Sequence, residues 1–303
     1  MSDIDFDTAF EPRYGEPMQL SALVRRIACN NPGPFTGSGT NTYLVGRGAV
    51  AVIDPGPEND AHYAAIRAAT AGERVSHIVI THTHADHSPL ARRLQAETGA
   101  KTYGFGPHGA GRPAPEGLRL DASGDHAFVP DVAVRHGDPI DGDGFRLEAV
   151  FTPGHTSNHM AYALDAERTL FTGDHVMAWA TSVIAPPDGH MASYMASLRT
   201  LIERANDELY LPGHGPPKAK PQSFARAYLA HRQMRETAIL EAIRAGHQRV
   251  GHIVPLVYKG LDPKLHAAAG LSTLAHVEHL IEQAKVRALD DDADPALRRY
   301  AAV

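Results

Sequence analysis

Seven consecutive residues constrain the fold of this chain more than any other segment. Residues 81–87 read Thr-His-Thr-His-Ala-Asp-His and directly follow the apolar run at residues 78–80. The apolar run predicts a buried strand, and the polar residues predict a loop at its end. Alternate residues of an extended segment point to one side, so His82 and His84 can face one position while Asp86 and His87 reach a second. We interpret this loop as a metal-binding loop and not as a solvated surface segment.

Three later segments offer a candidate ligand in a similar way. His155, Asp174 and His214 each follow a glycine, and each glycine comes shortly after a run that predicts a strand. Glycine lets the backbone turn sharply, so the next side chain projects from the end of the strand. One such pair is a weak signal, but four strand-end loops in order indicate a metal site built from several parts of the fold.

The composition limits the chemistry of this site. The chain has 19 histidines but a single cysteine, Cys29, which excludes intrachain disulfides and thiolate-only zinc sites and predicts a reducing compartment. Imidazole and carboxylate donors suit Zn²⁺, Mn²⁺ or Fe²⁺. No apolar stretch approaches the roughly 20 residues of a membrane span, and the first seven residues are acidic where a secretory signal is basic. We therefore expect a cytoplasmic protein without a membrane segment.

The predicted secondary structure changes from mixed strands and helices to helices alone near residue 217. Before it, strands are predicted at 42–45, 49–53, 77–80, 145–151 and 169–171, and helices at 61–70 and 89–98, so a layered α/β core is expected. Residues 104–115 are dense in Gly and Pro and are interpreted as a flap or insertion. After it, helices are predicted at 224–243, 261–269 and 271–284. We predict a catalytic domain at 1–217 and a small helical domain at 218–303.

Charge is distributed unevenly between these two parts. The net charge of the 303 residues is −6, but residues 1–217 carry −10, residues 218–303 carry +4 and residues 218–289 alone carry +6. Solvated helix faces are commonly basic, so this balance permits contact with a polyanion without requiring one. Aromatic residues make up 7% of the chain, with one Trp, and offer no obvious platform for stacking bases.

Taken together, Asp54, the loop at 81–87, His155, Asp174 and His214 resemble the motif series of the metallo-β-lactamase superfamily. Residues 31–43, 156–160, 194–198 and 231–240 extend the resemblance to its β-lactamase-like protein 2 branch. The resemblance implies a four-layer αββα sandwich with the site at one edge of two sheets, and a C-terminal winged-helix-like domain. Residues 104–124 and 178–190 depart from the pattern, where the substrate should contact the enzyme.

The same resemblance implies how the candidate ligands are used. Asp54 would orient a ligand histidine through its ring N–H. Two Zn²⁺ ions per chain are implied, with Mn²⁺ or Fe²⁺ as alternatives. The implied ligands are His82, His84 and His155 for the first ion, Asp86, His87 and His214 for the second, and Asp174 as a bridge between them.

The implied mechanism needs no side-chain nucleophile. A hydroxide shared by two ions attacks the substrate, because the metals lower the pKa of water to about 7. Asp86 is expected to orient the attacking water in addition to binding metal. His159 is a second candidate catalytic residue: it either donates a hydrogen bond or proton to the reacting group, or only caps its loop, and the sequence leaves both open.

Several substrates fit such a site. We expect an ester, thioester or related small-molecule acyl substrate, with single-stranded RNA cleavage as the alternative and β-lactam hydrolysis at most as a side activity. A nucleic-acid-binding regulator with a structural metal is disfavoured, because structural zinc sites fill all positions around one ion, whereas seven ligands for two ions leave room for water. The C-terminal segment is expected to act as a lid and dimerisation element, which implies a homodimer.

Overall fold

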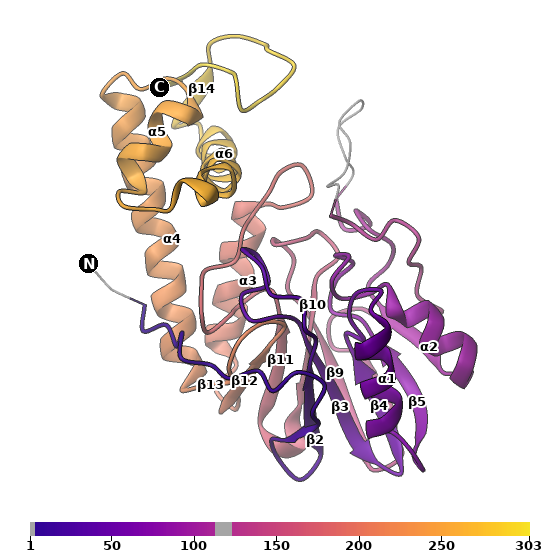
Figure 1. The fold of residues 1–303 in the computed structure, drawn as a ribbon. Helices are drawn as coiled ribbons and strands as arrows, with labels where there is room; N and C mark the ends of the chain where they lie inside the picture. The colour runs from indigo at the N-terminus through magenta and orange to yellow at the C-terminus, as the bar shows by residue number, and fades with distance from the viewer. Residues whose placement is uncertain (1–3, 113–122) are drawn as a thin grey trace.

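The fold is seen in a computed structural model that describes residues 4–112 and 123–303 (Figure 1). Residues 113–115 of the expected flap lie outside the described residues, and residues 104–112 form the end of a strand and the loop after it. Strands of the first half are β1 (Met18–Gln19), β2 (Val24–Ala28), β3 (Asn41–Arg47), β4 (Ala49–Ile53), β5 (Arg74–Val79), β6 (Lys101–Gly104) and β7 (Val132–Ala133). Those of the second half are β8 (Pro139–Gly142), β9 (Phe145–Phe151), β10 (Met160–Leu164), β11 (Thr169–Gly173), β12 (Leu209–Pro212), β13 (Lys218–Ala219), β14 (Val286–Ala288) and β15 (Tyr300–Ala302).

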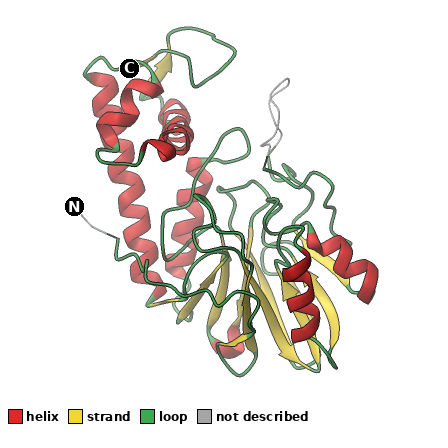
Figure 2. Ribbon diagram, in the orientation of Figure 1, coloured by secondary structure: helices red, strands yellow, loops and turns green. Residues whose placement is uncertain are grey.

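Two sheets form the centre of the molecule. The first has the order β1-β2-β3-β4-β5-β6-β7, antiparallel up to β4 and parallel from β4 onward. The second has the order β13-β12-β11-β10-β9-β8 and is antiparallel except for the parallel pair β11–β12. Helices α1 (Asp60–Ala69) and α2 (Leu90–Thr98) flank the first sheet, and α3 (Met191–Glu203) and α4 (Pro221–Arg244) lie on the side of the second (Figures 1 and 2).

Side-chain alternation along the strands separates the layers. In β10, Met160 and Tyr162 join the core between the sheets, whereas Ala161 and Ala163 pack toward α3 and α4. Successive side chains of a strand point to opposite faces, and sheets covered on both faces are apolar on both. The expected four-layer αββα sandwich is therefore confirmed.

The C-terminal region forms a separate hydrophobic cluster. It contains the second half of α4, α5 (Val250–Val257), α6 (His266–Glu282) and the β14–β15 pair, with the 3₁₀ turn η2 (Pro263–Leu265) before α6. The prediction of two helices at 261–269 and 271–284 is wrong, because one helix runs through Gly270. Helix α5 was not expected from the sequence.

Helix α4 joins the two parts of the molecule. Phe224 and Tyr228, near its beginning, belong to the core between the second sheet and α3, whereas Ile239 and Ile243 belong to the C-terminal cluster. The domain boundary at 217/218 stays a prediction, since one continuous helix contributes to both cores. Among the described residues, no helix is long and apolar enough to cross a membrane.

Candidate metal centre

The four motif loops leave their strands at the same edge of the sandwich, where the loops gather beneath the C-terminal helices (Figure 2). At two of the motif positions, glycine is required for a steric reason. A Cβ atom on Gly173, whose φ is +48°, would lie 2.7 Å from His159 Nε2, and one on Gly213 would lie 2.5 Å from Asp174 Oδ1. The backbone therefore approaches the site too closely for any larger residue.

One group of donor atoms comes from β5, β9 and the loops after them. His84 Nδ1 lies 3.0 Å from His82 Nε2 and 3.0 Å from His155 Nε2. Three ring nitrogens thus converge on one position, as the sequence predicts for the first ion.

A second group lies beside the first. His214 Nε2 is 3.3 Å from His87 Nε2 and 3.2 Å from Asp86 Oδ2, and Asp86 Oδ2 is 3.4 Å from His87 Nε2. These three residues are the ones expected for the second ion.

Asp174 lies between the two groups. Its Oδ2 atom is 3.7 Å from His155 Nε2 and 3.3 Å from His214 Nε2, and its buried Oδ1 has no hydrogen-bond partner. Ligand atoms about 2.1 Å from a tetrahedral ion are about 3.4 Å apart, which is close to the spacing within both groups. Closely packed ring nitrogens and a buried carboxylate oxygen that has no hydrogen bond and lies 3.5 Å from His87 Nε2 fit bound divalent cations, since such groups are otherwise unfavourable.

The far sides of three of the rings are held by protein oxygen atoms. His87 Nδ1 lies 3.0 Å from Asp54 Oδ2, His155 Nδ1 2.7 Å from the Val183 carbonyl oxygen, and His214 Nδ1 3.1 Å from the Gly39 carbonyl oxygen. Such contacts fix the tautomer, so that Nε2 presents its lone pair to the centre. Asp54 is thus placed as expected, outside the donor groups and against a predicted ligand.

The carboxylates and imidazoles perturb one another strongly. Burial alone would lower the pKa of His214, but the carboxylates of Asp174 and Asp86 raise it to about 10. Burial, together with His84, lowers the pKa of His155 to about 4. Burial would raise the pKa of Asp174, but His214 and His87 hold it well below its ordinary value. Protons and metal ions therefore compete for the same lone pairs.

His159 lies behind the donor groups. The residue is fully buried, Nδ1 lies 2.8 Å from Thr152 Oγ1, and Nε2 accepts a hydrogen bond of 3.2 Å from the Asp174 backbone N–H. Both ring nitrogens are thus occupied within the protein. This arrangement favours a positioning role over proton donation to a leaving group.

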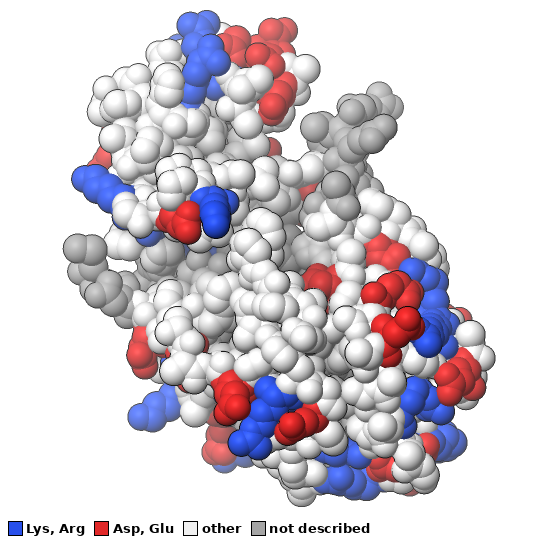
Figure 3. Space-filling model, viewed as in Figure 1, with Lys and Arg blue, Asp and Glu red and all other residues white. Residues whose placement is uncertain are grey.

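The donor groups open into a cavity of about 920 Å³. Five predicted ligands line one end, and the walls continue through the loop at 177–185 to the C-terminal helices. The apolar part of the wall includes Phe6, Phe35, Met177, Trp179, Leu261, Leu265 and Leu271. In Figure 3 the middle of the visible face, between the C-terminal helices and the sheets, is largely white, with a few charged residues at its margins.

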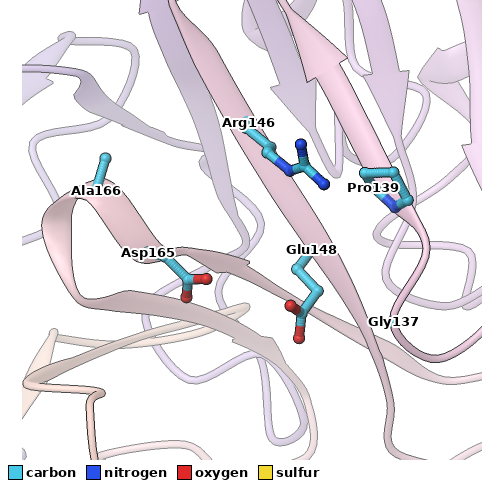
Figure 4. Close-up of a pocket in the computed structure, with 6 residues that line it drawn as sticks. All are labelled: Gly137, Pro139, Arg146, Glu148, Asp165 and Ala166. Atoms are coloured by element: carbon cyan, nitrogen blue, oxygen red, sulfur yellow. The ribbon is translucent and has the colours of Figure 1, made fainter.

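A smaller cavity of about 220 Å³ lies against β8, β9 and the 3₁₀ turn η1 (Asp165–Glu167). Arg146, Glu148 and Asp165 line it, and none of the predicted ligands does (Figure 4). The metal centre and the larger cavity therefore define the candidate site.

Sequence reasoning missed the second end of the larger cavity. Arg232, Arg235 and Tyr258 line it, and although Arg232 and Arg235 lie in the segment 231–240 that carries the resemblance, they were not predicted to belong to the site. Only the packing of α4 against the loop at 177–185 brings them near the metal centre, and the sequence carries no local signal of that packing.

The chain is similar to known proteins over most of its length. Residues 35–214 match the family model described as the metallo-beta-lactamase superfamily, and residues 250–294 match the beta-lactamase associated winged helix domain. A Caenorhabditis elegans protein named beta-lactamase-like protein 2 homolog is 36% identical over 234 residues, which cover 76% of this chain and 74% of the relative.

Two further proteins are similar over much of their length. An Aspergillus fumigatus protein named atrochrysone carboxyl ACP thioesterase is 32% identical over 239 residues, covering 77% of this chain and 69% of the relative. A beta-lactamase domain protein from Burkholderia ambifaria has the same fold, with a TM-score of 0.77, 23% identity, and coverage of 99% of this chain and 97% of its own.

Proposed function

Because the chain belongs to the metallo-β-lactamase superfamily and is a metal-dependent hydrolase, we propose that it hydrolyses an ester, a thioester or a related acyl compound with two bound zinc ions. The ligands in this proposal are His82, His84 and His155 for one ion, Asp86, His87 and His214 for the other, and Asp174 between them. One observation carries it: these donors converge at one end of a large cavity instead of being enclosed. Structural zinc sites are closed, whereas catalytic sites keep a position open.

Side chains of the chain have distinct tasks in this reaction. Bound divalent ions supply a Lewis acid for the substrate carbonyl and lower the pKa of water enough for hydroxide to be the nucleophile near neutral pH. Asp86 reaches the cavity and accepts a hydrogen bond from the attacking water, which orients it. His159 holds the backbone of Asp174, and Asp54 holds the ring of His87.

The largely apolar wall supports an acyl substrate over RNA. A single strand of RNA needs a series of cations along the path of its backbone. The cavity has arginines only at its α4 end, Arg232 and Arg235, and the rest of its wall is mostly apolar side chains such as Met177 and leucines, which suit a carbon chain or ring system. The thioesterase name of one relative supports the same choice.

The test combines metal analysis with a substrate panel of thioesters, lactones, β-lactams and single-stranded RNA. Wild-type protein should bind two equivalents of zinc and hydrolyse acyl substrates. Asp174→Ala should lose metal and activity, whereas Asp143→Ala, in an exposed turn, should retain both. RNA cleavage without acyl hydrolysis would favour the alternative, and an Asp174→Ala protein with two zinc equivalents and full activity would contradict the bridging role.

A further inference from the structure

A buried cation lines the cavity away from the predicted ligands. Arg232 projects from α4, lines the cavity and is 2% exposed. Arg235, one turn further along α4, lines the same end. Two arginines therefore line a cavity whose walls are otherwise mostly apolar.

Protein carboxylates do not neutralise this pair. Arg232 Nη2 donates to the Ser182 carbonyl, its Nε has no hydrogen-bond partner, and its guanidinium lies 5.1 Å from the centre of the Tyr194 ring. Arg235 donates to the Val257 carbonyl and lies over the Tyr258 ring. Across residues 4–112 and 123–303, no carboxylate oxygen lies within 4.0 Å of either guanidinium. A buried charge without a counter-charge is unfavourable, so an anion in the cavity would be bound strongly.

Arg232 is also close to the reacting end of the cavity. Ser182, whose carbonyl binds Arg232, donates its hydroxyl hydrogen to the backbone carbonyl of Asp174. The next residue, Val183, binds the ring of His155 through its own carbonyl. One short segment thus connects the arginine to two predicted metal ligands.

We propose that Arg232, assisted by Arg235, forms a subsite for an anionic group of the substrate, a carboxylate or a phosphate, while the acyl carbon lies at the metal centre. The inference rests on the proposed acyl hydrolysis and deepens it. The guanidinium fork matches both oxyanions, since it donates two parallel hydrogen bonds. The substrate class is therefore an acyl compound with an apolar body and an anionic group.

Matched thioesters test the subsite with metal-loaded, full-length protein. One pair has acyl chains of equal length that end in a carboxylate or a methyl group. A second pair has the same neutral acyl group on a thiol with or without a phosphate. Wild-type protein should prefer the charged member of one pair by roughly 10- to 100-fold in kcat/KM, the range expected for hydrogen bonds to a charged group. The pair that shows the preference identifies the source of the anion.

Arg232→Met removes the charge and keeps much of the apolar volume, and the ratio of kcat/KM within the preferred pair should fall close to one. Arg226→Met, on the exposed face of the same helix, is the matched control and should keep the wild-type ratio. If Arg232 only anchors the loop at 177–185, Arg232→Met should lower kcat/KM for both members of the pair by the same factor. An unchanged ratio in Arg232→Met, or no charged preference in wild type, would overturn the proposal.

Calorimetry with non-hydrolysable thioether analogues separates this proposal from the proposed reaction. If wild-type protein hydrolyses none of the thioesters, acyl hydrolysis fails as the function, but the subsite still predicts tighter binding of a charged analogue. That difference should be lost in Arg232→Met and kept in Arg226→Met. Equal binding of charged and neutral analogues to wild-type protein would overturn the subsite.

Discussion

The two ends of the large cavity satisfy their polar groups in different ways. At the metal end, the rings of His87, His155 and His214 are each held from behind by a protein oxygen. At the α4 end, Arg232 Nε, His231 Nδ1 and the Tyr258 hydroxyl have no hydrogen-bond partner. The rings of the first end are pre-organised for one kind of chemistry, whereas the second end leaves two buried nitrogen atoms and a buried hydroxyl without a protein hydrogen bond. We infer that reaction and selectivity are separated along the cavity.

Removal of metal should have the largest effect and acts on one end only. A chelator should reduce acyl hydrolysis at least about 100-fold, because no other group in the proposed mechanism activates water. Added Zn²⁺ should restore activity, and the melting temperature should fall on chelation, because the ions bind only the folded chain. Activity that persists in metal-free protein, verified by elemental analysis, would contradict the role of the metal end.

A change behind the metal end should have the next largest effect. Asp54 accepts hydrogen bonds from the Thr81 backbone N–H at 2.8 Å and from its hydroxyl at 2.6 Å, and also lies against His87. Asp54→Ala should lower metal affinity or activity by roughly 10- to 100-fold, as for other residues that orient ligands. Zinc titration and kcat/KM measure this. The control is Asp60→Ala, at the exposed start of α1, and equal losses in both variants would show that Asp54 has no special role.

The candidate ligands of the metal end could be named from the sequence because ligand identity and strand-end position are both local properties. Strands β4 and β9 have the predicted bounds, and α2 ends at Gly99 in the left-handed conformation, as expected. The structure brings all seven predicted ligands together. For His159, residue type alone could not distinguish a group in the cavity from one behind it.

The C-terminal region was predicted less well, because packing there overrides local signals. Gly270 suggests a break, yet α6 continues through it. A Cβ at this position would lie 4.0 Å from Val250, so the glycine gives up little packing by having no side chain. Pro255 disfavours a helix, but Ile253 and Val257 anchor α5 in the C-terminal core. The role of Arg232 depends on contacts 50 residues apart in the chain, which no short pattern encodes.

The free energy of unfolding should also depend on pH through the buried side chains behind the metal end. His62 is buried, and its Nε2 lies 2.8 Å from Thr42 Oγ1, which donates to the Asp54 carbonyl. Burial lowers the pKa of His62 from 6.5 to about 4. Between pH 7 and 5 the unfolded chain therefore gains a proton here that the folded chain does not, which lowers the free energy of unfolding by about 2 kcal/mol. The contribution of neutral His62 to the free energy of unfolding is present above the ordinary pKa of 6.5 and is lost as the pH falls toward the folded-state pKa of about 4.

Denaturant unfolding at pH 7 and pH 5 checks this effect. In His62→Gln the loss of stability between the two pH values should be about 2 kcal/mol smaller than in wild type, because glutamine does not titrate. His252→Gln, on the exposed surface of α5, should lose as much as wild type. An identical loss in all three proteins would place the acid sensitivity elsewhere in the molecule.

The smallest effect is expected at the α4 end, where Leu265 forms part of the apolar wall. Leu265→Ser removes apolar contact of about 1 kcal/mol, so KM for an acyl substrate should rise several-fold. The contact is the same in the ground and transition states, so kcat should not change. Leu256→Ser is the control, because Leu256 is exposed and does not line the cavity. A fall in kcat at constant KM would mean that the C-terminal region takes part in the chemistry, and the separation of the two ends would fail.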